Sequence, residues 1–127
     1  MVTGIGIDVQ THEELRLPLD DPFFARCYTL AELDQARERT NPTEYLAGRF
    51  AAKEAVVKAF GIDTDRVRLT DIEVLDGPAG APSCRLRGDL GKLAQAHGLT
   101  DALVSISHAK GLSTAMALLQ SSGETTR

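Results

Sequence analysis

An acid and an amine stand one helical turn apart in the longest helix that the sequence predicts. Glu54 and Lys58 are four residues apart within the stretch 44–60, so both side chains project from one face of that helix. A second acid, Asp8, stands near the end of an apolar run over 2–9 that predicts a buried strand. The helical pair is either a surface ion pair or part of a phosphate site, and Asp8 is either a structural cap or a metal ligand.

Other residues with donor groups could contact phosphate. Arg49 and Lys53 precede Lys58 on the same predicted helix, where they either hold phosphate groups or form a solvated surface with their stems over the core. His108 closes the apolar strand over 103–107. Its imidazole either donates to a phosphate or satisfies a neighbouring backbone carbonyl.

Two glycines and two cysteines have special backbone or thiol chemistry. Gly4 and Gly6 interrupt the first strand, which indicates a bulge or a close backbone approach rather than a dinucleotide fingerprint. Cys27 and Cys84 lie far apart without the spacing of a zinc site. We expect both cysteines to be reduced, buried thiols.

Hydrophobic periodicity and turn residues predict an alternation of strands and helices. The predicted elements are a strand over 2–9, a short helix after Thr11, helices over 30–39 and 44–60, strands over 69–75 and 83–87, a helix over 89–98 capped by Asp89, and strands over 102–107 and 113–119 joined at Lys110-Gly111. Thr29 with Glu32 has the spacing of a capping box, and we expect Thr43 to cap the longest helix and Gly61 to end it. The expected fold class is α+β, with a small, mostly antiparallel sheet packed with one long and several short helices.

The composition is that of a folded protein of one domain. The chain has 127 residues, of which 43% are apolar and 25% charged. We expect a domain over 1–120 and a flexible tail over 121–127. The net charge of −4 argues against non-specific binding of nucleic acid. No apolar run is long enough to span a bilayer and no signal peptide is recognisable, so we expect a cytoplasmic protein without a membrane partner.

Taken together, three segments resemble the holo-acyl-carrier-protein synthase family of the 4′-phosphopantetheinyl transferase superfamily. They are Gly4-Ile5-Gly6-Ile7-Asp8, then Leu46-Ala47-Gly48-Arg49-Phe50-Ala51-Ala52-Lys53-Glu54-Ala55 continuing to Lys58, and Ser105-Ile106-Ser107-His108. Phe23, Arg26, Thr29, Glu32 and the stretch Asp71-Ile72-Glu73-Val74 are also similar to the family. The resemblance extends over nearly the whole chain, up to about Leu119.

The resemblance implies the family's fold, a homotrimer, and coenzyme A bound in clefts between adjacent protomers. It makes Asp8 and Glu54 the ligands of a magnesium ion, and Asp8, Glu54 and Lys58 the catalytic residues. The implied contacts of coenzyme A are Arg49, Lys53, Lys58, Gly61, Ser107 and His108. The implied reaction is attack by a serine of an apo acyl carrier protein on the β-phosphorus of coenzyme A, which releases 3′,5′-adenosine bisphosphate. Glu54 acting through a metal-held water is a hypothesis for the base.

Two departures from the family pattern concern the carrier protein. The stretch 12–16 contains Glu13 and Glu14 where the family has basic residues that grip an acidic carrier helix, and Ala109 replaces a threonine or aspartate. These changes suggest a carrier from a specialised polyketide or related pathway.

Two other functions compete with transfer: a non-catalytic module that binds coenzyme A or a carrier, and a magnesium-dependent phosphotransfer enzyme acting on nucleotides. Retention of the acids and the lysine argues against the first, and the surrounding motifs argue against the second.

Overall fold

The structure is a computed structural model that describes residues 1–121. The elements are β1 (Val2–Thr11), α1 (Pro22–Cys27), α2 (Leu30–Arg37), α3 (Pro42–Phe60), β2 (Ile72–Asp76), β3 (Pro82–Leu86), α4 (Gly88–Ala96), β4 (Leu99–Ala109) and β5 (Leu112–Ser121), with 3-10 helices at Glu13–Leu15, Thr64–Arg66 and Leu69–Asp71. Ser121 therefore ends β5, and the rest of the predicted tail lies outside the described residues. No helix within 1–121 combines the length and apolarity needed to cross a bilayer.

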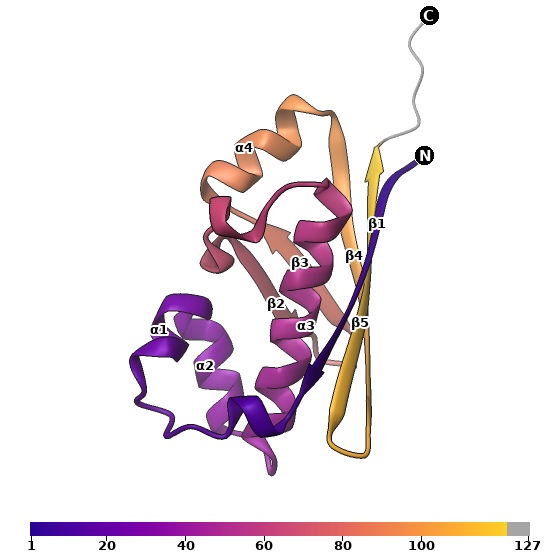
Figure 1. Ribbon diagram of the computed structural model, residues 1–127. Coiled ribbons are helices and arrows are strands. Elements are labelled where there is room, and N and C mark those ends of the chain that lie inside the picture. Colours follow the sequence, from indigo (N-terminus) through magenta and orange to yellow (C-terminus); the bar gives the residue numbers. More distant parts are fainter. Residues whose placement is uncertain (122–127) are drawn as a thin grey trace, which may run out of the picture.

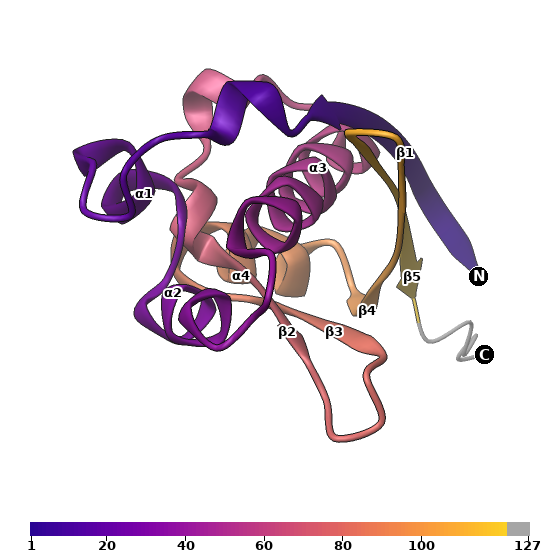
Figure 2. The same cartoon turned by 90° about the horizontal axis from the view of Figure 1, so that it is seen from below.

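The strands form two antiparallel sheets, ordered β1-β5-β4 and β2-β3. Helix α3 runs along one face of the three-stranded sheet, α1 and α2 lie on the other side of that helix, and the β2-β3 hairpin runs beside α3 and reaches β4 (Figures 1 and 2). The predicted α+β class with antiparallel pairing is confirmed. Because α3 is covered on both sides, eleven of its residues are buried. This long helix is the centre of the molecule.

Most predicted helices are present, but some begin at other residues. The capping box at Thr29 and Glu32 is confirmed. Helix α3 starts before Thr43, because the Asn41 side chain accepts from the Glu44 backbone N–H and a proline occupies its first turn. Helix α4 likewise begins at Gly88 rather than after Asp89. Gly61 ends α3 with a positive φ of 73°, as predicted.

Two short segments before α2 differ from the prediction. The helix expected after Thr11 is only a 3-10 turn at Glu13–Leu15. Helix α1, which the prediction missed, begins at Pro22, where the side chain of Asp21 accepts from the backbone N–H of Phe23. It supplies the buried Phe24 and the partly buried Phe23 to a second core cluster between α1, α2 and α3.

The predicted close approach at the glycines of β1 is confirmed. A Cβ on Gly6 would lie 2.0 Å from the Ala55 carbonyl oxygen, and one on Gly4 would lie 2.2 Å from the Ala59 carbonyl oxygen. The register also shifts between Val2 and Gly4. Strand β1 thus lies directly against the backbone of α3, where no side chain fits.

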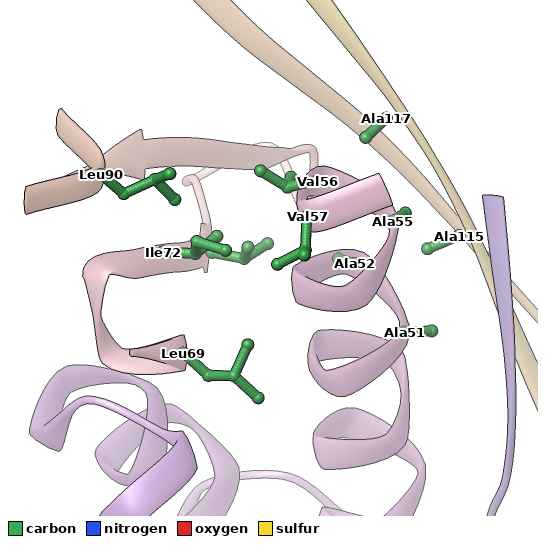
Figure 3. Close-up of a cluster of buried hydrophobic side chains, with 11 residues drawn as sticks. Ala51, Ala52, Ala55, Val56, Val57, Leu69, Ile72, Leu90, Ala115 and Ala117 are labelled. Atoms are coloured by element: carbon green, nitrogen blue, oxygen red, sulfur yellow. The ribbon is translucent and has the colours of Figure 1, made fainter. Parts of the chain in front are cut away.

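Small residues continue this close packing along the sheet. Ala51 and Ala55 of α3 face Ala115 and Ala117 of β5, and all four are buried (Figure 3). Larger side chains of the same cluster, including Ile72 and Leu90, fill the space on the other side of α3 (Figure 3). The alanine-rich helix therefore packs close to the sheet, and the short distance between them leaves room only for small side chains.

Strand β1 is buried on one face only, contrary to the prediction of a fully buried strand. Gly6 and Asp8 face α3, whereas Ile5, Ile7 and Val9 are 64%, 62% and 59% exposed. Leu103 of β4 and Met116 of β5 lie on the same side and are also exposed. We call Ile5, Ile7, Val9, Leu103 and Met116 the open face of the sheet.

Candidate active site

Strand β1 and helix α3 bring two of the predicted site residues into contact. The ammonium of Lys58 donates to Asp8 Oδ1 at 2.8 Å and to the carbonyl oxygen of Ile7 at 3.0 Å. Asp8 reaches the helix because it lies two residues after Gly6, on the same face of β1, where the strand lies against the backbone of α3. The close approach at Gly6 therefore positions the carboxylate of Asp8.

Glu54 lies one turn before Lys58 on the same side of α3. The hydroxyl of Thr64 donates to Glu54 Oε2 at 3.1 Å. Thr64 begins the short 3-10 helix that follows α3, and nothing in its sequence context distinguishes it from other loop threonines. It was therefore missed by sequence reasoning, although it orients one of the two acids. We call Asp8, Glu54 and Lys58 the acid–lysine centre.

The two acids of this centre stabilise the charged form of Lys58. The hydrogen bond to Asp8, then the charge of Asp8 and more weakly that of Glu54, raise the pKa of Lys58 above its usual value. Lys58 is therefore an ammonium at neutral pH and cannot act as a proton acceptor. Its side chain is 55% exposed, while that of Asp8 is 18% exposed. The cation is accessible to an anionic ligand from solvent.

The donor set fits a hard divalent cation that also binds a substrate. Among residues 1–121, no group of three or more histidine, cysteine, aspartate or glutamate side chains is arranged to enclose a metal ion. The centre instead offers two carboxylates beside an open surface. Magnesium commonly takes one or two carboxylates and completes its octahedron with substrate phosphates and water. Asp8 and Glu54 suit that mode of binding better than a closed structural site.

Arg49 and Lys53 lie elsewhere, buried on the side of α3 that faces β2. The guanidinium of Arg49 donates to the Val74 carbonyl oxygen at 3.1 Å and pairs with Asp76. Arg49 is 3% exposed and Lys53 0%. The alternative of a solvated surface is wrong for both residues, and the structure does not bring either one to the acid–lysine centre.

Lys53 belongs to a buried ion pair that joins three elements. Its ammonium lies 2.8 Å from Glu32 of α2 and donates to the Leu69 carbonyl oxygen at 2.8 Å. Glu32 also accepts from the Val74 backbone N–H at 2.7 Å. Burial lowers the pKa of Lys53, and the neighbouring Glu32 opposes that effect. Helix α2, helix α3 and strand β2 are thus held together by charges that have no access to water.

The remaining predicted contacts lie at other places on the subunit. Gly61 is exposed directly after the last turn of α3, with open space around it. Ser107 and His108 lie near the end of β4, at the edge of the sheet opposite to β1. Ser107 lies on the same side as the open face, and His108 lies on the side of α3. Within one subunit, His108 is therefore separated from Asp8 by the width of the sheet.

His108 has a hydrogen-bond partner that neither reading of the sequence anticipated. Its Nδ1 lies 2.6 Å from the hydroxyl oxygen of Ser113. Burial lowers the pKa of His108, and the charge of Glu44 opposes that effect. The ring also lies against α3, because a Cβ on Gly48 would be 2.7 Å from His108 Cε1. The imidazole is thus held by a side chain and a helix backbone.

The two cysteines are not nucleophiles that could compete with the acid–lysine centre. Cys27 and Cys84 are free thiols, each half-buried and so less buried than predicted. Burial raises the pKa of both thiols, that of Cys84 to about 12. Neither is a ready nucleophile. A cleft of about 560 Å³ between β3 and β4 contains none of the predicted site residues.

Comparisons with known proteins identify the family of this chain. The family model of the 4′-phosphopantetheinyl transferase superfamily matches residues 4–113. A holo-acyl-carrier-protein synthase of Natranaerobius thermophilus is 36% identical over 124 residues, which cover 95% of this chain and 99% of the relative. One of Alkaliphilus metalliredigens is 38% identical over 120 residues, covering 93% and 98%.

Solved structures show the same fold. The crystal structure of holo-acyl-carrier-protein synthase from Neisseria meningitidis has a TM-score of 0.83 at 30% identity, covering 94% of this chain and 99% of that one. A holo-acyl-carrier-protein synthase from Bacillus anthracis in complex with CoA (3′,5′-ADP) has a TM-score of 0.78 at 34% identity, covering 96% and 99%. The match extends over nearly the full length of both chains in sequence and in structure, and this chain belongs to the holo-acyl-carrier-protein synthase family of the 4′-phosphopantetheinyl transferase superfamily.

Proposed function

We propose that this chain is a cytoplasmic enzyme that transfers the 4′-phosphopantetheine of coenzyme A to a serine of an apo acyl carrier protein, leaving 3′,5′-adenosine bisphosphate. The observation that carries the proposal is the contact of Lys58 with Asp8, on the helix face that also bears Glu54. The relatives' names and the coenzyme A in the Bacillus anthracis structure support it. A carboxylate pair beside an exposed ammonium is suited to a pyrophosphate with its metal ion.

In this proposal each residue of the acid–lysine centre has its own task. Asp8 and Glu54 hold magnesium, and Thr64 keeps the carboxylate of Glu54 in place. Magnesium, when bound, offsets negative charge on the pyrophosphate and on the transferring phosphoryl group. Lys58 donates to a phosphate oxygen or to the leaving group, because its ammonium is exposed and charged at neutral pH.

The same proposal includes a homotrimer with sites between protomers. The open face exposes five large apolar side chains on a single sheet surface, which a monomer would leave in water. Ser107 and His108 lie at the sheet edge opposite to Asp8, so a neighbouring subunit is the natural source of those contacts for a given acid–lysine centre. In this proposal Arg49 and Lys53 have a structural role and do not contact coenzyme A, because both are buried and paired within the subunit.

The identity of the carrier is proposed from the surface of this chain that follows β1. Glu13 and Glu14 are exposed on the 3-10 turn after β1. Glu13 pairs with Arg16 at 3.1 Å, and Glu14 accepts from Thr11 at 2.8 Å. Two acids at this place would repel an acidic carrier helix. A carrier of a specialised pathway with a less acidic helix is therefore the proposed partner, and equal or faster turnover of a housekeeping fatty-acid carrier in competition would contradict it.

Intact mass spectrometry tests the transfer itself. The protein is incubated with coenzyme A, magnesium and several apo carrier proteins, and one carrier should gain a phosphopantetheine group. Asp8→Ala and Glu54→Ala should abolish the gain, whereas Asp34→Ala, which removes an exposed acid of α2, should not. Wild-type protein that binds coenzyme A but labels no carrier would favour the non-catalytic module. Full transfer by both acid variants at limiting magnesium would refute the ligand assignment.

A further inference from the structure

Outside the acid–lysine centre, one hydroxyl links two imidazoles. His12 Nε2 lies 2.8 Å from Ser113 Oγ, and His108 Nδ1 lies 2.6 Å from the same oxygen. Ser113 is fully buried and His12 is 7% exposed, whereas His108 is exposed. The chain of hydrogen bonds therefore runs from a buried imidazole, through a buried hydroxyl, to an imidazole that a ligand can reach.

The register of the three-stranded sheet builds this arrangement. Ser113 lies directly opposite His108 in the pairing of β5 with β4. His12 follows the last residue of β1, and its backbone N–H donates to the Gly111 carbonyl oxygen at 2.9 Å. The ring centroids of His12 and His108 are 6.1 Å apart, with Ser113 bridging the two rings. Three separate segments converge on one oxygen.

A serine hydroxyl has one proton to donate, so the two bonds cannot be independent. If Ser113 donates to His108 Nδ1, then His12 Nε2–H donates to Ser113 and the proton of a neutral His108 lies on Nε2. If Ser113 donates to His12 instead, the proton of His108 lies on Nδ1 and its Nε2 is only an acceptor. Phosphate oxygens accept hydrogen bonds, so an anionic ligand at His108 selects the first arrangement.

We propose that Ser113 and His12 are positioning residues that keep the proton of His108 on Nε2, so that this residue meets a phosphate oxygen of coenzyme A as a hydrogen-bond donor. The inference rests on the proposed function, in which His108 contacts coenzyme A. Besides His12, the charged side chains around His108 are Glu44, Arg49 and Asp76. Of all the described side chains, only Ser113 is within hydrogen-bonding distance of Nδ1.

Nitrogen-15 spectra of the imidazoles test the tautomer directly. The chain has three histidines, and the exposed His97 serves as an internal reference. With coenzyme A bound, His108 of the wild type should carry its proton on Nε2, with Nδ1 unprotonated. The signals of His12 should change on addition of coenzyme A although it is buried behind Ser113. In Ser113→Ala the response of His12 should disappear and His108 should show both tautomers.

Kinetics test whether the arrangement matters for transfer. Ser113→Ala should lower kcat/KM for coenzyme A about tenfold, mainly through KM, because one hydrogen bond to a charged group loses its fixed donor. His12→Leu should lower it in the same direction, and His12→Gln should restore it, because the glutamine amide can donate to Ser113. Ser83→Ala, which removes an exposed strand serine, should leave kcat/KM unchanged.

A double-mutant cycle separates positioning from a general structural effect. In a His108→Ala background, Ser113→Ala should cause no further loss in kcat/KM, since the serine acts only through that imidazole. An additive loss would overturn the inference, as would a proton on Nδ1 of His108 in the complex. If Ser113→Ala does not fold, His12→Leu and His12→Gln are tested in the same His108→Ala background, where neither should change kcat/KM. A wild type that neither binds coenzyme A nor labels carriers would instead refute the proposed function and the inference together.

Discussion

Lys53 and Lys58 are five residues apart on one helix, yet their chemistry is opposite. Lys53 is fully buried against Glu32, and burial lowers its pKa. Lys58 is exposed beside Asp8, which raises its pKa. The first ammonium is enclosed by protein oxygen atoms, whereas the second remains able to exchange its carboxylate partner for a phosphate. Only Lys58 is therefore suited to substrate.

A residue-scale prediction concerns acid. Burial lowers the pKa of His108 below the usual 6.5, so the unfolded chain takes up this proton at higher pH than the folded protein does. The contribution of His108 to stability is then fully present above that value and is lost as the pH falls through the folded-state pKa. The melting temperature should fall more steeply from about pH 7 to about pH 5 in wild type than in His108→Gln. Parallel melting curves of the two proteins would contradict this.

At the scale of elements, the approach of β1 to α3 predicts the effect of a single methyl group. Gly6→Ala would place a Cβ 2.0 Å from the Ala55 carbonyl oxygen, so the strand must move away from the helix. We expect a loss of about 2–3 kcal/mol in the free energy of unfolding. Displacement of Asp8 should also lower kcat about 100-fold under conditions where the variant is folded.

Gly77→Ala is the matched control for this prediction. A Cβ there would lie 3.6 Å from the Ala81 carbonyl oxygen, an ordinary contact. Urea unfolding and transfer kinetics of this variant should match the wild type within error. Equal effects of the two substitutions would show that the proximity of β1 to α3 is not what positions Asp8.

The buried ion pair predicts a second effect at this scale. Glu32→Ala would leave the Lys53 ammonium and the Val74 backbone N–H without their carboxylate partner. Breaking such a pair costs about 3–5 kcal/mol, whereas an exposed pair contributes at most about 1 kcal/mol. Asp34→Ala, which removes the exposed partner of Arg37 on the same helix, is the control in urea unfolding. A loss below that of the control would mean that water reaches Lys53.

Signals from residues close in sequence predicted the helices and strands better than they predicted what surrounds each side chain in the folded protein. The capping box of α2 and the glycine that ends α3 depend on neighbours in sequence, and both were predictable. The start of α3 was misplaced because Thr43 and Asn41 both have cap chemistry, although Pro42 in the first turn favours Asn41 and could have decided between them. The environment of Lys53 depends on Glu32, which is twenty-one residues away in sequence, so its spacing on the helix could not reveal that it is buried.

At the scale of the whole molecule, the proposed trimer predicts that two variants, each lacking a different residue of the site, can complement each other. One chain carries Asp8→Ala and the other His108→Ala, and the two are unfolded and refolded together. If each site takes Asp8 from one protomer and His108 from its neighbour, about a quarter of the sites in an equal random mixture are intact. Carrier labelling should then recover to about a quarter of the wild-type rate.

Sedimentation and an open-face variant complete this test. Ile7→Asp places a charge within the open face and should shift the sedimenting species to a monomer. No recovery of labelling in the mixture, from variants shown to exchange subunits, would place the whole site within one subunit.

The sequence alone could not indicate the open face, because an apolar strand has the same pattern whether the chain itself or a second copy covers it.

The turn between β4 and β5 has a consequence for how the length of this chain can vary. Lys110 and Gly111 both have positive φ, and Ala109 pairs directly with Leu112. One inserted residue would reverse the two sides of β5, presenting Ser113 to the open face and Met116 to the helix. The connection over 77–81 between β2 and β3 carries no comparable constraint on the site. Insertions and deletions in natural variants should therefore be found in that loop and not between Ala109 and Leu112.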